Sequence, residues 1–378
     1  MKIKPMTKFA ILALSLVLVA CAGGGSEEAG CPAIDGREIN VVATTPMIGE
    51  FVSQVGGENI NLTVLMPPEA NPHTYEPAPQ DAGTIAEADL VFYTGLLYEP
   101  AALVKLLENS ACSTDILSEV GESVFPIEFK EGGHDDHDDH DDHDDHDDHD
   151  DEEGHDDEEG HDDEEGHDDH DDEEGHDDHD DEEGHDDHDD EEGHDDHEGH
   201  NHGAYDPHFW FDPSRVAYAA EYIESRLIQF DPENESSYKS SADSFVSELN
   251  DLTKQVSELI STVPSQNRKL ITTHESLGYL EAKFGLEVLS TIIPSLNSAN
   301  EISPSDLAGV IDVIEDNNVK VIFIESEAPS VYSETIVAET GIKPVTGLYV
   351  ETLKPGQSYS EFLISNVKLI TENLQDTD

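Results

Sequence analysis

The sequence predicts an α/β fold with two lobes, each built on a parallel β-sheet flanked by helices, and one long rigid helix that joins them. Two observations lead to this fold. Short apolar runs rich in β-branched residues alternate with segments suited to helices, which is typical of parallel sheets covered on both faces. A long helical pattern, residues 234–263, separates two such series.

The first lobe, residues 38–233, contains three buried apolar runs, each followed by a helical segment. Strands are predicted at residues 38–44, 60–66 and 90–94, and helices at 47–55, 80–88 and 99–109. A further helix begins at Asp212-Pro213 and extends to Gln229, because Asp is a preferred N-cap and Pro is favoured at the first helical position.

Apolar residues recur along the linking helix at alternating spacings of four and three, which places them in one stripe. They are Phe245, Leu249, Leu252, Val256 and Leu259. Pro264 ends this helix, and the alternation resumes in the second lobe, residues 264–378. Strands are predicted there at 269–273, 287–292, 319–325 and 343–348, and helices at 276–284, 304–316, 331–339 and 359–374.

The N-terminus has the features of a bacterial lipoprotein signal peptide, residues 1–20. Three lysines accompany the apolar segment Phe9–Ala20, which is too short to span a bilayer. This segment ends in Leu-Val-Ala-Cys, so we expect Cys21 to become the lipidated first residue of the mature protein. Residues 21–37 would then be a flexible tether at the outer face of the cell membrane.

Two further cysteines, Cys31 and Cys112, form an even pair in a chain with an export signal. A disulfide between them would tie the N-terminal arm to the first lobe. Two buried free thiols are the alternative, and the spacing of the residues does not decide between them.

The segment from Gly132 to His202, within an insertion at residues 131–203, consists almost entirely of His, Asp, Glu and Gly. It holds 18 of the 21 histidines of the chain. We expect it to be disordered without a ligand, because it has no apolar side chains to offset the entropy of ordering. A solvated acidic linker is one interpretation. The density of histidines favours another, an auxiliary collector that binds several zinc ions weakly.

The charge of the chain is strongly negative. The formal net charge is −72, and 44 of the 89 acidic residues lie in residues 131–202. Outside this segment, 45 acidic residues face 17 basic ones, which leaves −28. Such a surface argues against nucleic acid and anionic lipid headgroups as partners and favours cations.

Three histidines remain outside the insertion, and each lies in a distinctive polar segment. His73 is in NPHTYEP after a predicted strand, His208 is in DPHFWFDP, and His274 ends a strand in ITTHES. A lone histidine is usually structural. Three of them at loop and strand-end positions, in a chain with no others to spare, point instead to a metal site in the cleft between the lobes.

These three motifs, in this order, resemble those of the metal-binding lipoproteins that serve ABC importers of zinc and manganese, the cluster A-I solute-binding proteins. The resemblance extends from Glu38 to the C-terminus and includes the linking helix. The insertion before the second motif is similar to that of the zinc-specific branch, although here it is longer and more regular.

The resemblance implies that His73, His208 and His274 bind Zn²⁺ as the transported ligand. In the manganese branch the third position is usually a carboxylate. The fourth ligand in many members is an acid after a short apolar strand, which nominates Glu351 here. A water ligand, with Glu351 as a solvated helix-cap acid, is the alternative. The resemblance further implies a monomer that delivers zinc to a membrane permease with a cytoplasmic ATPase.

The chemistry of the residues agrees with zinc, because three imidazoles and one oxygen suit a tetrahedral ion, whereas manganese prefers more oxygen donors. Glu275, next to His274, is either an acceptor that fixes a ring tautomer or an ordinary surface acid. We do not expect an enzyme, because the ligands come from separate loops and no nucleophile or carboxylate pair accompanies them. The alternatives are a manganese importer component and a metal-binding adhesin or metallochaperone.

Overall fold

The computed structural model of the chain describes residues 31, 33–34, 36–68, 70–129, 205–293, 303–326 and 331–375. The predicted signal peptide, Cys21 and the insertion at residues 131–203 lie outside the described residues. None of the helices within these ranges has both the length and the apolar character that crossing a bilayer requires.

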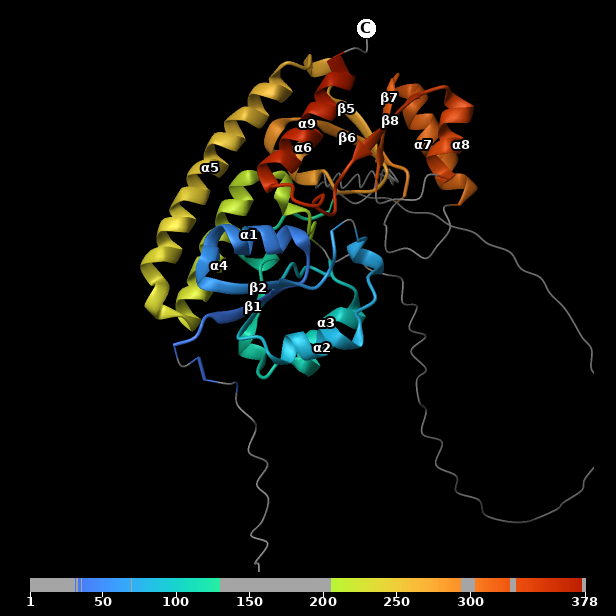
Figure 1. Ribbon diagram of the computed structural model, residues 1–378. Coiled ribbons are helices and arrows are strands. Elements are labelled where there is room, and N and C mark those ends of the chain that lie inside the picture. The colour runs from blue at the N-terminus through green and yellow to red at the C-terminus, as the bar shows by residue number, and fades with distance from the viewer. Residues whose placement is uncertain are drawn as a thin grey trace, which may run out of the picture. The chain divides into compact units, whose positions relative to one another are not determined.

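The N-terminal strands form one parallel sheet in the order β2-β1-β3-β4, of which β1 and β2 are labelled in Figure 1. Their bounds are β1 Ile39–Ala43, β2 Ile60–Val64, β3 Leu90–Tyr93 and β4 Leu117–Glu119. The first three strands are as predicted. Strand β4 was not predicted, because its three residues, Leu-Ser-Glu, are too few to show a hydrophobic pattern.

Four helices accompany this sheet: α1 Pro46–Gly56, α2 Pro79–Ala86, α3 Ala101–Ser110 and α4 Pro213–Phe230. Local sequence signals explain where two of them begin. The Thr45 side chain accepts a hydrogen bond from the N–H of Ile48, and the Asp212 side chain accepts one from the N–H of Ser214. Each cap is followed by a proline, so the predicted start of α4 is confirmed.

The C-terminal strands form two parallel pairs, β5-β6 and β7-β8. The elements are β5 Lys269–Thr272, α6 Gly278–Phe284, β6 Glu287–Thr291, α7 Pro304–Asp316, β7 Val321–Glu325, α8 Val331–Thr340, β8 Lys343–Leu348 and α9 Tyr359–Gln375. A single sheet was expected. Strands β5 and β7 lie in contact but belong to separate sheets. At this contact the Glu325 N–H donates to the Thr273 hydroxyl, 3.0 Å, instead of to a main-chain carbonyl.

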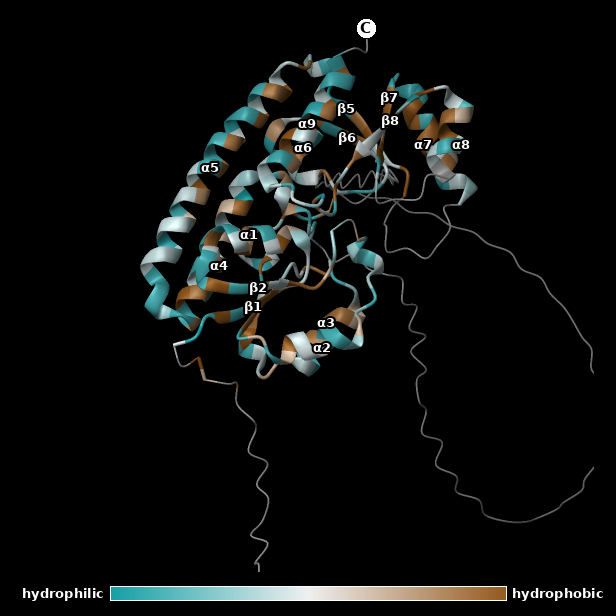
Figure 2. Cartoon of the chain, viewed as in Figure 1, coloured by the Kyte–Doolittle hydropathy of each residue, from teal (hydrophilic) through white to brown (hydrophobic). Residues whose placement is uncertain are grey.

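The long helix α5, Glu235–Ser261, packs against α1 and α4 and also against α6 and α9 (Figure 1). Its buried stripe contains Phe245, Leu249, Leu252 and Val256 as predicted, but ends on Ile260, while Leu259 is only partly buried. In Figure 2 hydrophobic colour dominates strands β5 and β7, whereas α5 alternates between hydrophobic and hydrophilic positions.

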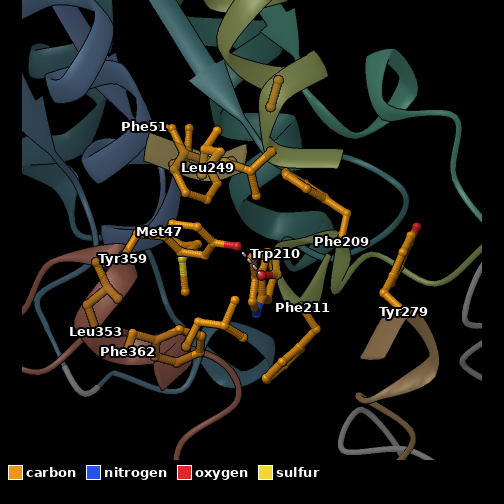
Figure 3. Packing of buried hydrophobic residues seen from close by; sticks show 14 of the residues in the cluster. Met47, Phe51, Phe209, Trp210, Phe211, Leu249, Tyr279, Leu353, Tyr359 and Phe362 are labelled. Atoms are coloured by element: carbon orange, nitrogen blue, oxygen red, sulfur yellow. Dashed lines mark hydrogen bonds between the residues drawn. The ribbon is translucent and has the colours of Figure 1, made fainter. Parts of the chain in front are cut away.

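One hydrophobic cluster includes residues from both groups of strands, such as Leu90 of β3 and Phe323 of β7. Its aromatic centre is shown in Figure 3. Phe51 packs edge-to-face on Tyr359 at 5.2 Å between ring centroids, and the Tyr359 hydroxyl donates to the Trp210 carbonyl, 2.6 Å. The α/β fold is confirmed, and its two groups of strands share a core.

A disulfide joins Cys31 to Cys112, with the two Cα atoms 5.0 Å apart. Cys31 precedes β1 and Cys112 follows α3, so the bond ties the N-terminal arm to the first group of elements. Of the two interpretations that the sequence left open, the structure has the bonded pair.

The chain leaves for the insertion and returns at adjacent positions. Glu128 and Tyr205 form an isolated antiparallel bridge, and the Asp206 N–H donates to the Ile127 carbonyl, 2.9 Å. The described fold is therefore continuous across the insertion.

Candidate metal centre

Four short connections bring His73, His208, His274 and Glu351 together. His73 lies in a single 3-10 turn, Pro72–Thr74, whose start is fixed because the Asn71 side chain accepts from the His73 N–H, 2.9 Å. His208 immediately precedes another such turn, Phe209–Phe211. His274 follows β5, and Glu351 follows β8, so two of the ligands lie just beyond the carboxyl ends of parallel strands, where ligands commonly bind.

Oε1 of Glu351 is central to this group. It lies 3.1 Å from Nε2 of His73, 3.4 Å from Nε2 of His208 and 2.8 Å from Nε2 of His274. The two Nε2 atoms of His208 and His274 are 3.5 Å apart. One donor atom from each of the four residues lies within 4.8 Å of the others, which is close enough for one ion to contact all four.

All four side chains are withdrawn from solvent, with exposed fractions of 3% for each histidine side chain and 0% for Glu351. Glu351 is therefore not a solvated helix-cap acid. Three nitrogen donors and a carboxylate oxygen in a buried group form a donor set that suits a divalent transition-metal ion.

Asp206 orients His208. Its Oδ1 accepts from the His208 main-chain N–H and lies 2.8 Å from Nδ1, so Nδ1 donates to Asp206 and Nε2 faces Glu351. The DPH motif places this acid two residues before the histidine, which is a signal that sequence reasoning overlooked.

Glu325 performs the same function for His274. Its Oε2 is hydrogen-bonded to Nδ1 of His274, and its Oε1 accepts from the His274 N–H at 3.2 Å. Of the two interpretations of Glu275, the acceptor that fixes the tautomer of this ring does not hold, because Glu325 at the end of β7 reaches Nδ1 instead. Only the contact of β5 with β7, which belongs to the other strand pair, brings Glu325 there, so local sequence could not indicate it.

His73 differs from the other two rings. Its Nδ1 is buried and has no hydrogen-bond partner among the described residues. The ring is held instead by packing, with Tyr98 edge-to-face at 5.1 Å between centroids. Its tautomer is therefore not fixed by a protein acceptor as it is in His208 and His274.

The carboxylates raise the proton affinity of two of these rings. Burial alone would lower the pKa of His208, but Glu351 and Asp206 outweigh it and raise that pKa to about 9. Burial opposes Glu325 and Glu351 in the same way at His274, whose pKa rises to about 10. Burial would raise the pKa of Glu351, but the adjacent His73 and His208 lower it well below its usual value.

Comparison with known proteins places this arrangement in a family. The family described as "ZnuA: Zinc-uptake complex component A periplasmic" matches residues 41–373. The manganese ABC transporter substrate-binding lipoprotein PsaA of Streptococcus anginosus is 24% identical, over 98% of this chain and 99% of that protein. The high-affinity zinc uptake system protein ZnuA of Bacillus subtilis is 26% identical, over 97% and 96%.

A solved structure, the periplasmic zinc-binding protein TroA from Treponema pallidum, has the same fold. Its TM-score is 0.65 at 18% sequence identity, and the match covers 89% of this chain and 99% of that one. The buried donor set, the fold and a family match along almost the whole described chain agree with one another. The chain belongs to the ZnuA family of periplasmic metal-uptake components, which are extracytoplasmic substrate-binding proteins of ABC metal importers and not enzymes.

Proposed function

We propose that the transported ion is Zn²⁺, bound by His73, His208, His274 and Glu351. The main support for zinc is the spacing of the four donor atoms. Four ligands at the usual zinc distances of about 2.0–2.1 Å form a tetrahedron with edges of about 3.3 Å. Four of the six edges are given above, from 2.8 to 3.5 Å, and fall on either side of that value, while the other two lie within 4.8 Å.

Manganese is the second candidate, because relatives of this chain bear manganese names as well as zinc names. Manganese prefers more oxygen donors and a higher coordination number than this site provides. Three imidazoles with one carboxylate oxygen therefore support zinc. Copper(II) binds nitrogen sites more tightly still, so selection against it requires imposed geometry and limited availability.

The remaining parts of the proposal concern the setting of the site. Lipidated Cys21 anchors the protein through the tether at residues 21–37, and the monomer passes zinc to a permease driven by a cytoplasmic ATPase. The insertion at residues 131–203 collects further zinc ions near the site. Lobes at residues 38–233 and 264–378, with the linking helix between them, support the ligand loops from both sides.

The direct test is metal binding by single alanine variants of the three histidines in a protein that lacks residues 131–203. Each variant should bind zinc at least tenfold more weakly, or about 1.4 kcal/mol. His208→Ala and His274→Ala also remove rings that pair with buried carboxylates, so metal-free thermal unfolding serves as the control for folding. Unchanged zinc affinity in all three variants would contradict the assignment. Tighter binding of manganese than zinc by the parent protein would favour the second candidate.

A further inference from the structure

The two oxygens of the Glu351 carboxylate have different neighbours. Oε1 faces the three histidines, whereas Oε2 lies 2.9 Å from the hydroxyl of Tyr98. The same hydroxyl lies 3.0 Å from the Glu351 carbonyl oxygen. Neither oxygen can donate, so Tyr98 is the donor, and its single proton is shared between Oε2 and the carbonyl oxygen.

We propose that Tyr98 is a positioning residue that sets the metal preference of the site. By occupying Oε2, it holds Glu351 as a ligand that offers one oxygen. This inference rests on the proposed function and extends it, because it names the residue that keeps the site four-coordinate.

The tyrosine ring has little freedom to turn away. It packs edge-to-face against His73 at 5.1 Å and against Trp210 at 5.3 Å between ring centroids. Trp210 in turn donates from Nε1 to the Val350 carbonyl, 2.8 Å. The peptide groups on both sides of Glu351 are therefore held by Tyr98 and Trp210, whose rings also pack against His73 and His208.

The loop that carries Tyr98 is held in an unusual conformation. Leu96 and Leu97 have φ angles of 53° and 60°, in the left-handed region that non-glycine residues rarely adopt. Such a conformation persists only where surrounding contacts enforce it. Here Oε1 of Glu119 accepts from the Leu96 N–H, 2.9 Å, and the buried Glu99 accepts from the Gly95 N–H, 2.9 Å.

Glu99 also accepts from the Thr94 N–H and from the Thr44 hydroxyl, both at 2.7 Å. The loop is thus tied to the ends of β1 and β3 directly before Tyr98. These contacts hold the strained turn in place beside the site. The turn itself fixes the position of the Tyr98 hydroxyl relative to Glu351.

The consequence for metal choice follows from coordination chemistry. A carboxylate with two free oxygens can bind an ion through both, which raises the coordination number toward the one that manganese prefers. A carboxylate with one oxygen engaged by a neutral donor supplies a single bond, as four-coordinate zinc requires. Tyr98 therefore disfavours manganese without touching the ion.

The test compares Tyr98→Phe with Tyr238→Phe in the full chain. Tyr238 is a matched control, because it is also buried and its hydroxyl also donates to a carboxylate, that of Asp231 at 2.6 Å. Zinc and manganese affinities of the tight site are measured by chelator competition at one metal equivalent. In Tyr98→Phe the preference for zinc over manganese should fall by about tenfold, at the lower end of the effects of removing an outer hydrogen-bond partner. The Tyr238→Phe preference should equal that of the parent.

The same comparison is then made in a Glu351→Gln background. An amide side chain has one oxygen, so loss of the Tyr98 hydroxyl releases no second oxygen donor, and the change in preference should disappear. A purely structural effect of Tyr98→Phe would persist there and would contradict the proposal.

X-ray absorption at the zinc edge counts the ligands of the bound ion in the unmutated protein, so this measurement requires no variant. Four light ligands support the proposal, and five or six overturn it. A parent protein that fails to bind zinc tightly would refute the proposed function. A parent that binds zinc tightly, with an unaltered preference in Tyr98→Phe, would refute only the role of Tyr98.

Discussion

Asp206 receives two hydrogen bonds from His208, one from the main-chain N–H and one from Nδ1, both at 2.8 Å. The same carboxylate oxygen therefore fixes the backbone and the ring of a metal-site histidine. Because Nδ1 donates to it, Nε2 is the nitrogen that binds an ion once its proton has left. The charge of Asp206 also makes the ring more basic, which strengthens it as a ligand.

Asp206→Asn should weaken zinc binding by about tenfold to a hundredfold, the usual effect of altering such a partner. The amide oxygen can still accept a hydrogen bond, so the main loss is of charge. Zinc titration measures the change, and Asp212→Asn, at the helix cap of α4, tests whether any nearby acid has the same effect. Equal losses in both variants would show that Asp206 has no particular importance for His208.

The pKa values of about 9 and 10 for His208 and His274 give metal binding a steep pH dependence. Both rings are protonated at pH 7 in the metal-free protein, and binding must displace both protons. The apparent zinc affinity should rise by about two orders of magnitude per pH unit near neutrality, and the slope should decrease above about pH 9. Calorimetry in buffers with different ionisation enthalpies counts the released protons. Release of no protons at pH 7 would contradict these pKa shifts.

This result changes an expectation about the insertion. The histidines of the insertion are surrounded by acids in the sequence, so we predict that they lose metal as the pH falls through about 6 to 7. With fewer acids near them in the sequence, the three histidines outside the insertion would be expected to retain metal at lower pH. The premise that these three have few acidic neighbours is wrong, because Asp206, Glu325 and Glu351 lie against them.

Removal of the disulfide should lower stability without altering the metal site. The bond joins residues 81 positions apart, and loss of a bond that closes a long loop typically costs about 2–4 kcal/mol in the free energy of unfolding. The Cys31→Ser/Cys112→Ser double variant should show this loss in denaturant titrations. Its zinc affinity should match that of the parent, since neither cysteine is among the four ligands. A parallel loss of affinity would indicate that the N-terminal arm supports the site.

Deletion of residues 131–203 should leave the tight site intact and remove several weaker ones. The bridge between Glu128 and Tyr205 brings the ends of the deletion together, so a short linker can close the gap without moving Asp206. Calorimetric titration should show one tight zinc site in the shortened protein and additional weak sites in the full chain. Loss of tight binding on deletion would mean that the insertion supplies a ligand to the primary site.

Cys21 should carry the lipid anchor, as the preceding Leu-Val-Ala indicates. In Cys21→Ser the protein should be released from the membrane or remain as the unprocessed precursor. Intact-mass spectrometry of the membrane fraction distinguishes these cases. Cleavage at another position, with an unmodified Cys21, would be the contrary result.

Much of the fold could be predicted because its elements are locally encoded. Asp212-Pro213 starts α4, and the apolar stripe beginning at Phe245 defines α5. The three histidines were identifiable because so few lie outside the insertion. Strand β4 and the division of the C-terminal strands depend instead on contacts between distant segments. The same holds for Tyr98, which reaches Glu351 only after the strained loop and β8 have been placed by the rest of the fold.

The bridge between Glu128 and Tyr205 also bears on how such a chain can evolve. The His-Asp-Asp and Glu-Glu-Gly units of the insertion are short sequence repeats. Because Glu128 and Tyr205, which flank the insertion, pair with each other, a change in copy number need not move the strands and helices on either side. We therefore expect the number of repeats to be variable among such chains without displacement of the four ligands of the site.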